Sequence, residues 1–197
     1  MSSTNGNTVE NENYPTPESA VRALMAKLDL KADDTFLEPC CGDLHDAEGN
    51  PTPCIYNLVD LSESRKYWAE IRMGREFLGM DFEGRKFDVI ITNPPFSLSC
   101  EFLTKCMGLL NDGGTLIFLQ RVNWLGSKKR VKFWKDVTFP EKTPILVPRP
   151  KFNKAKKGTD SCEYCWYIWD KGGRTARAIP VGLSHIIAEG YKIDAAA

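Results

Sequence analysis

The sequence predicts an α/β fold with a doubly wound, mostly parallel sheet and an antiparallel C-terminal strand. Two observations predict this class. Short apolar runs rich in β-branched residues alternate with helical patterns along most of the chain, as they do in βαβ units. These runs stop abruptly, one of them at Asn93-Pro94-Pro95-Phe96, where consecutive prolines force an extended backbone that lacks N–H donors. In open α/β sheets, ligands bind at the carboxyl ends of such strands.

Size and composition are those of an ordinary globular protein. The 197 residues suit one domain, which we expect over residues 14–197 after a polar, disordered tail at 1–13. The net charge is zero, so nucleic-acid binding would need a local basic patch. Neither a membrane-spanning run nor a signal peptide is evident, which predicts a cytoplasmic protein with no membrane partner. Seven irregularly spaced cysteines indicate reduced thiols.

The local patterns predict two main helices and seven strands. Thr16 is the expected N-cap and Pro17 the first residue of the first helix. Ser97 or Ser99 is expected to cap a second helix that a glycine turn at 111–114 ends. The aromatic run at 163–169 is expected to be antiparallel and near the sheet edge. The expected strands cover residues 35–38, 55–60, 77–82, 89–92, 115–119, 144–148 and 163–169.

Acidic residues end three of these expected strands. Glu38 precedes a turn at Gly42, Asp60 ends the next run, and Asp81 ends the weaker run that follows. An acid at a strand end before a glycine turn is typical of nucleotide-binding βα units. Since a single such acid is common, the signal lies in three of them at corresponding places, followed by the Asn93 loop.

This constellation resembles class I S-adenosylmethionine-dependent methyltransferases of the N6-adenine type, which have a Rossmann-like fold, over residues 14–169. Tyr14-Pro-Thr-Pro17 resembles the segment that meets the cofactor carboxylate in the gamma-type motif order. Arg149-Pro-Lys-Phe152 and residues 158–169 resemble the small phage and prophage DNA adenine methyltransferases in particular. The resemblance implies S-adenosylmethionine as cofactor, DNA as partner and, for a phage-derived chain, the bacterial cytoplasm as its location.

The resemblance also implies roles for single residues. Glu38 would meet the methionine ammonium of the cofactor, Asp60 the ribose diol, Asp81 the adenine amino group and Phe82 an adenine face. Leu44 departs from the pattern, because it occupies the place of a second glycine in the first turn. The implied cofactor-binding residues are Thr16, Pro17, Glu38, Pro39, Gly42, Asp43, Asp60, Asp81, Phe82 and Asn93.

The Asn93 loop is the expected catalytic element, formed by Asn93, Pro94, Pro95 and Phe96. An exocyclic amine is a poor nucleophile because its lone pair is delocalised into the ring. The Asn93 side-chain oxygen and the Pro94 carbonyl would each accept one N–H and turn that lone pair toward the methyl group. Phe96 would stack on a flipped target base, which offsets part of the cost of flipping it.

Cationic residues gather in two later segments, and we expect them to contact nucleic-acid phosphates. Lysine clusters are often only solvated faces, but both segments follow expected strand ends on the presumed site side. With Phe96, the expected nucleic-acid-binding residues are Lys128, Lys129, Arg130, Arg149, Lys151, Phe152, Lys154, Lys156 and Lys157.

Several alternatives stay open at this stage. Related Asn-Pro-Pro loops act on RNA bases and on glutamine side chains, and a relative that has lost cofactor binding would be a non-catalytic nucleic-acid-binding module. No metal is expected, because Cys162 and Cys165 would point to opposite faces of one strand. A cytosine-C5 nucleophile at Cys40 is disfavoured, since that chemistry needs a cysteine where this chain has Asn93. The target sequence and the oligomeric state are not predicted.

Overall fold

The computed structural model describes residues 13–152 and 158–192. Most of the expected tail at 1–13 therefore lies outside the described residues, as do Lys154, Lys156 and Lys157. In the part that is described, no helix is long and apolar enough to cross a membrane.

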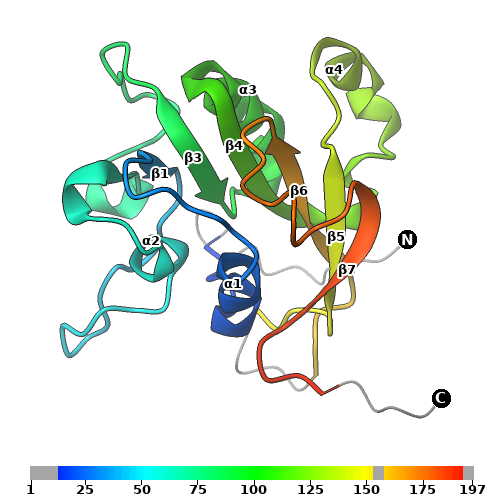
Figure 1. Cartoon of the computed structure of the whole chain (residues 1–197), viewed down its shortest axis with the longest axis horizontal. Helices are drawn as coiled ribbons and strands as arrows, with labels where there is room; N and C mark the ends of the chain where they lie inside the picture. Colours follow the sequence, from blue (N-terminus) through cyan, green and yellow to red (C-terminus); the bar gives the residue numbers. More distant parts are fainter. Residues whose placement is uncertain (1–12, 153–157, 193–197) are drawn as a thin grey trace.

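A mixed sheet of seven strands forms the centre of the fold, in the spatial order β2-β1-β3-β4-β6-β5-β7 (Figure 1). Neighbouring strands are parallel except for β6, which runs antiparallel to both β4 and β5. The predicted doubly wound, mostly parallel sheet is thus confirmed. The strands are β1 (Phe36–Glu38), β2 (Lys66–Trp68), β3 (Phe87–Thr92), β4 (Leu110–Arg121), β5 (Lys142–Val147), β6 (Tyr164–Asp170) and β7 (Gly182–Ile187).

Helices cover both faces of the sheet, and each face has its own apolar core. In Figure 1, α1 (Glu18–Met25) lies in front of the sheet, where it packs with α2 (Ile55–Leu58) against alternate residues of β1, β3, β4 and β6. The other face packs against α3 (Ser99–Leu109) and α4 (Val131–Asp136). Every side chain of β6 is buried, because this strand lies inside the sheet with helices on both sides.

Several local predictions are wrong. Residues 55–60 form the short helix α2 and its end instead of a strand, because a short apolar run cannot by itself be assigned to helix or strand. The actual second strand is β2, and residues 77–82 are turns and loop. The antiparallel strand β6 is neither C-terminal nor at the edge, since β5 and β7 lie outside it. The N-cap of α1 is Pro17, one residue after the predicted position. The N-cap of α3 is Leu98 and neither Ser97 nor Ser99, and α3 passes directly into β4, so residues 111–114 belong to that strand instead of a turn.

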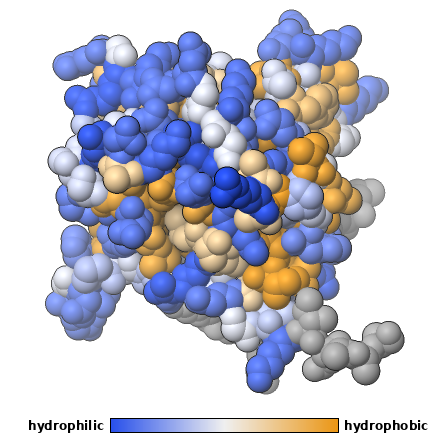
Figure 2. Space-filling view, in the orientation of Figure 1, coloured by the Kyte–Doolittle hydropathy of each residue, from blue (hydrophilic) through white to orange (hydrophobic). Residues whose placement is uncertain are grey.

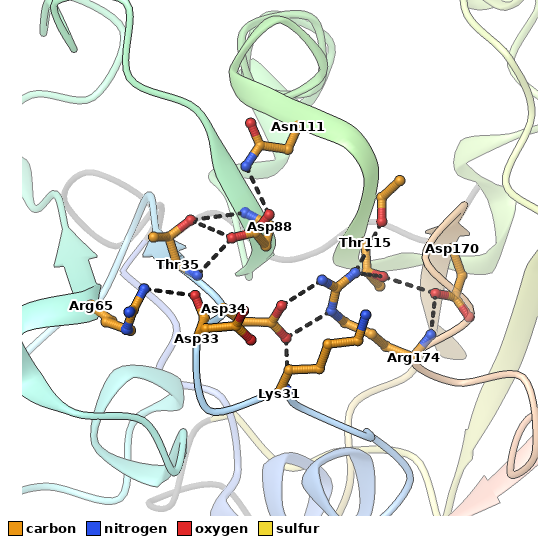
Figure 3. A network of polar contacts seen from close by, with 11 residues as sticks. Lys31, Asp33, Asp34, Thr35, Arg65, Asp88, Asn111, Thr115, Asp170 and Arg174 are labelled. Atoms are coloured by element: carbon orange, nitrogen blue, oxygen red, sulfur yellow. Dashed lines mark hydrogen bonds and ion pairs between the residues drawn. The ribbon is translucent and has the colours of Figure 1, made fainter.

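A buried polar network ties the strands together at the edge where the parallel strands begin (Figure 3). Arg174 donates two hydrogen bonds to the carboxylate of Asp34, just before β1, and one to the carbonyl of Gly113 in β4. Asp170, at the end of β6, accepts hydrogen bonds from Thr115 of β4 and Lys142 of β5. This edge is therefore closed by charge pairs that are satisfied within the protein.

The surface seen in Figure 2 is mainly hydrophilic, with separate hydrophobic areas that include the side where β7 lies. Val181 and Leu183, at the start of that edge strand, are 79% and 72% exposed. Scattered apolar residues of this kind are normal on a protein surface and need no special explanation.

Candidate active site

The carboxyl ends of four parallel strands meet at the edge opposite the polar network. β1 ends at Glu38, β2 leads into Glu70, β3 leads into Asn93, and β4 ends at Arg121. Beside them lies a cavity of about 900 Å³. Its lining comes from residues 13–18, 38–43, 52–55, 70–71 and 76–77, from Asn93, Pro95, Ser97, Leu98 and Phe102, and from Lys151 and Phe152. Pro94 and Phe96 of the Asn93 loop are not among the lining residues.

The turn after β1 supplies a buried carboxylate. Glu38 is 2% exposed, lines the cavity and accepts a hydrogen bond from the backbone N–H of Tyr56 at the start of α2. Burial raises the pKa of Glu38 well above its usual value, and the nearby negative charge of Glu70 adds to this, although the Tyr56 bond opposes it. A cation in the cavity would relieve this cost.

The turn after β1 accommodates Leu44, the residue that departs from the family pattern. Gly42 has a φ of +65°, which favours glycine, and an added Cβ there would meet nothing within 4 Å. Leu44 is buried in the core formed by α1 and α2, so it contributes packing at a position where the family pattern has glycine. Pro39 and Asp43 also line the cavity.

Glu70 is an acid of this site that sequence reasoning missed. It follows β2, is 8% exposed and lines the cavity. One of its oxygens accepts the N–H of Gly42 at 2.9 Å, and the other accepts Nε of Arg72 at 3.0 Å. Arg72 also pairs with Asp43 at 3.1 Å, which ties the end of β2 to the turn after β1. The short aromatic pair Tyr67-Trp68 before an acid was the available signal for this strand.

Two of the three predicted acids lie elsewhere. Asp60 is exposed, follows α2 and does not line the cavity. Asp81 is also exposed, is not among the lining residues, and accepts the backbone N–H of Glu83 in its own turn at 2.8 Å. Phe82 packs edge-on against Phe77 and is likewise not among the lining residues.

Glu76 and Phe77 occupy the cavity wall that was expected to be formed by Asp81 and Phe82. The Lys105 ammonium of α3 holds this turn in place. It donates to the carbonyls of Phe77, Leu78 and Met80 at 2.6, 3.0 and 2.5 Å. The cavity wall is thereby fixed to the same helix that follows the Asn93 loop.

The Asn93 loop is held in place at both of its ends. The side-chain nitrogen of Asn93 donates to the carbonyl of Tyr14 at 2.8 Å, so the oxygen is the end of this amide that remains to accept from an amine. Ser99 donates to the carbonyls of Pro95 and Phe96, and the amide of Gln120 donates to Ser99 in turn. Pro94 is buried. The loop is therefore rigid before any substrate binds.

The N-terminal segment crosses this loop. Thr16 and Pro17 line the same cavity as Glu38 and Glu70, which is where the resemblance placed them. Tyr14 lies nearly parallel to Phe96, with an interplanar angle of 10° and ring centroids 6.3 Å apart. The segment before α1 and the loop after β3 thus form adjoining parts of one site.

An aromatic cluster continues from Phe96. Tyr164, the first residue of β6, lies 5.8 Å from Phe96 and 4.9 Å from Phe152 between ring centroids. Arg121 places its guanidinium carbon 5.1 Å from the centroid of the Phe96 ring. Phe152 also lines the cavity. These rings form a surface on which a planar group could stack.

Of the predicted basic residues that the structure describes, only Lys151 lines the cavity. Lys151 is exposed at the cavity, whereas exposed Arg149 pairs with Glu163 at 3.8 Å and donates to the Ser161 carbonyl. Lys128, Lys129 and Arg130 form a short turn before α4. Arg130 lies close enough to Cys100, near the start of α3, to oppose the rise that burial causes in the pKa of that thiol. Trp124 and Trp134, which lie on either side of this turn in the sequence, are buried in the core.

The cysteines do not form a reactive or metal-binding cluster in the described residues. All seven are free thiols. Burial raises the pKa of both Cys40 and Cys41, which makes them poor nucleophiles. Within the described ranges, no three His, Cys, Asp or Glu side chains are grouped so that they could hold a metal ion.

Comparisons with known proteins agree on the fold. No protein-family model matches the sequence, and no curated protein matches it either. Solved structures do match. A protein of Listeria monocytogenes provisionally assigned as a class I S-adenosylmethionine-dependent methyltransferase is 16% identical, with a TM-score of 0.53 over 93% of this chain and 67% of its own.

Two further solved structures match over most of this chain. The M protein of the type I restriction enzyme EcoKI is 15% identical, with a TM-score of 0.51 over 80% of this chain but only 44% of its own. A dimethyladenosine transferase from Plasmodium falciparum is 15% identical, with a TM-score of 0.51 over 80% of this chain and 62% of its own. At such identities the likeness shows a class I methyltransferase fold and nothing further.

Proposed function

We propose that this protein transfers a methyl group from S-adenosylmethionine to the N6 amino group of adenine in DNA. The observation that carries the proposal is the Asn93-Pro94-Pro95-Phe96 loop at the carboxyl end of β3, beside a cavity lined by two buried acids. The fold likeness to class I methyltransferases supports it, and so does the likeness to the EcoKI M protein.

The residues present fit this cofactor. When bound, S-adenosylmethionine supplies an activated methyl group on a sulfonium. Glu38 is suited to its ammonium group, because a buried carboxylate with a raised pKa gains most from a cationic partner. Glu70 has a free lone pair on the oxygen that accepts the Gly42 N–H and is suited to the ribose hydroxyls, a role that the sequence had suggested for Asp60. Thr16, Pro17 and Gly42 border the same space, and Phe77 offers a ring for the adenine.

The Asn93 loop positions the acceptor amine. Because the amide nitrogen of Asn93 is bound to Tyr14, its oxygen accepts one N–H of the acceptor, and the Pro94 carbonyl accepts the other. Two acceptors favour a nitrogen whose lone pair is no longer delocalised and which becomes positively charged during transfer. Phe96 and Phe152 provide stacking surfaces for the base, each worth about 1–3 kcal/mol.

RNA is the second candidate acceptor, because a dimethyladenosine transferase is among the structures that share the fold. The loop binds a planar amine, so it does not by itself separate DNA from RNA or from a glutamine amide. Resemblance to the small phage DNA adenine methyltransferases favours DNA. Lys151, which is exposed at the cavity, favours a polyanionic acceptor over protein.

The proposal is tested with radiolabelled S-adenosylmethionine and unmethylated DNA, RNA and bulk protein offered separately, followed by nucleoside and amino-acid analysis. We expect label in N6-methyladenine of DNA. Label in RNA or in glutamine would replace the acceptor and keep the loop chemistry. No transfer to any acceptor, together with no cofactor binding, would contradict the proposal and favour a non-catalytic relative.

A further inference from the structure

Arg121 is a charged residue beside the proposed catalytic loop that the transfer chemistry above does not use. It ends β4, the neighbour of the strand that carries the Asn93 loop. Its guanidinium lies over the Phe96 ring, with 5.1 Å between the guanidinium carbon and the ring centroid. The same ring is the one proposed to stack on the acceptor base, so Arg121 borders the acceptor side of the site.

Tyr164 holds the guanidinium in a defined orientation. The two residues are direct partners on β4 and β6, and Nε of Arg121 donates to the Tyr164 hydroxyl at 3.3 Å. That hydroxyl donates to the carboxylate of Asp160 at 2.9 Å. One edge of the guanidinium is therefore fixed, while the fork formed by its two terminal nitrogens has no hydrogen-bond partner among the described residues.

The charge of Arg121 is not neutralised by a direct ion pair. Among residues 13–152 and 158–192, no carboxylate lies within salt-bridge distance of it, and Asp160 acts only from beyond Tyr164. Methyl transfer starts from a sulfonium cation and leaves positive charge on the acceptor nitrogen. A fixed guanidinium nearby opposes that charge unless the acceptor brings an anion with it.

We propose that Arg121 binds a phosphate of the nucleotide that carries the acceptor base. A guanidinium fork suits phosphate geometry, because two parallel N–H groups bind two phosphate oxygens at once. The phosphate would neutralise the guanidinium next to the reacting centre, and the contact to Phe96 would place that phosphate beside the stacked base. This inference rests on the proposed function, and it makes the site selective for nucleotides over glutamine side chains.

The test measures binding of a fluorescent DNA duplex and an RNA of the same sequence, with S-adenosylhomocysteine present, at several salt concentrations. Arg121→Met should weaken binding of the acceptor about tenfold or more and lower the slope of log K against log salt by about 1. Arg121→Lys keeps the charge without the fork and should retain the salt slope with weaker binding. Arg177→Met, which removes an equal charge from an exposed residue near the opposite edge, should leave both quantities unchanged.

A second measurement replaces the phosphate and keeps the wild-type chain, which guards against a variant that fails to fold. Neutral methylphosphonates are placed one at a time around an adenine. One position should weaken wild-type binding about as much as Arg121→Met does, and that position should have no further effect in the variant. Equal losses in wild type and variant at every position would overturn the proposal.

Methyl-transfer assays run in parallel separate this inference from the proposed function. Transfer to DNA with no effect of Arg121→Met on binding would leave the function standing and overturn the role of Arg121. Transfer to RNA with binding that depends on Arg121 would replace DNA as acceptor and support the phosphate contact. Transfer to glutamine, or failure to bind either nucleic acid, would overturn both.

Discussion

The two edges of the sheet differ in how their buried charges are balanced. Where the parallel strands begin, Asp34 meets Arg174 through two hydrogen bonds (Figure 3). At the same edge, the Asp170 carboxylate lies 3.0 Å from the Lys142 ammonium. Where these strands end, Glu38 is as deeply buried but forms no ion pair with any described residue. One edge is complete within the chain, while the other carries a buried carboxylate, that of Glu38, without an ion-pair partner among the described residues.

This difference indicates that one edge stabilises the fold and that the other is suited to binding a ligand. At the first edge, burial alone would raise the pKa of Asp34, yet its bonds to Arg174 and to the Lys31 N–H lower it. At the second edge, burial raises the pKa of Glu38 well above its usual value, although the hydrogen bond from the Tyr56 N–H opposes the rise. Charges that are left unbalanced inside a fold cost stability, and they are typical of ligand-binding sites. We therefore expect substitutions at the two edges to change different measured quantities.

The largest expected effect on stability comes from breaking the closed edge. Arg174→Met leaves the buried carboxylate of Asp34 without its partner and should lower the free energy of unfolding by about 3–5 kcal/mol. Urea denaturation measures it. The double change Asp34→Leu with Arg174→Met should recover much of the loss, because it removes the second charge as well. A single variant as stable as wild type would show that this edge does not hold the fold.

A matched pair of asparagines compares the edges in catalysis. Asn93→Ala removes an acceptor for the reacting amine and should lower kcat roughly 10²–10³-fold. Because it also removes the 2.8 Å hydrogen bond to the Tyr14 carbonyl, it should cost about 1 kcal/mol of stability. Asn111→Ala removes the 2.8 Å hydrogen bond to Asp88 at the closed edge. It should cost about 1 kcal/mol of stability and leave kcat unchanged. The comparison fails if both variants lose activity, or if both lose only stability.

A second matched pair identifies the acid that meets the cofactor. Glu70→Gln should raise the KM for S-adenosylmethionine about tenfold or more, because a hydrogen bond to a charged group is lost at the cavity wall. Asp60→Asn should leave that KM unchanged, since Asp60 is exposed and does not line the cavity. The reverse result would place the ribose at the residue that the sequence had suggested.

The smallest effects concern pH. The lowered pKa values of Asp34 and Asp170 mean that these acids stabilise the fold above pH 4, and that this stability is lost as the pH falls through their folded values. The contribution of Glu38 to stability depends on pH in the opposite direction. Its stability contribution is full below its unfolded pKa and is lost as the pH rises through its raised folded pKa.

The substitution Glu38→Gln isolates the contribution of the Glu38 charge to stability. At neutral pH this variant should be more stable than wild type in urea, by about 1.4 kcal/mol for each unit by which the pKa of Glu38 is raised. It should also bind S-adenosylmethionine more weakly. Below pH 4 the difference in stability should vanish. A variant that is less stable than wild type at neutral pH would show that the Glu38 charge is already balanced.

The sequence was sufficient for the sheet and for the Asn93 loop, because both depend on strong local signals. Long apolar strands such as β3 and β6 are recognisable from composition alone, and a double proline after a strand leaves few conformations. Thr16, Pro17, Glu38, Gly42, Asn93 and Pro95 all line one cavity.

The sequence was not sufficient where elements are short. β2 has three residues and α2 has four, so neither shows a full period, and the apolar run at 55–60 was assigned to a strand. That error assigned the expected ribose contact to Asp60, which does not line the cavity, and left out Glu70, which does. Arg121 was missed for another reason: its contacts with Phe96 and Tyr164 depend on strands that are distant in sequence.

The most direct test of the account is a calorimetric titration of S-adenosylmethionine into the wild-type protein at pH 7, repeated in two buffers of different ionisation enthalpy. We expect one S-adenosylmethionine site per chain. We also expect release of protons, because the cofactor ammonium would favour the charged form of Glu38, whose pKa burial has raised. No saturable heat in either buffer would contradict the claim that the unbalanced edge of this sheet is a cofactor site.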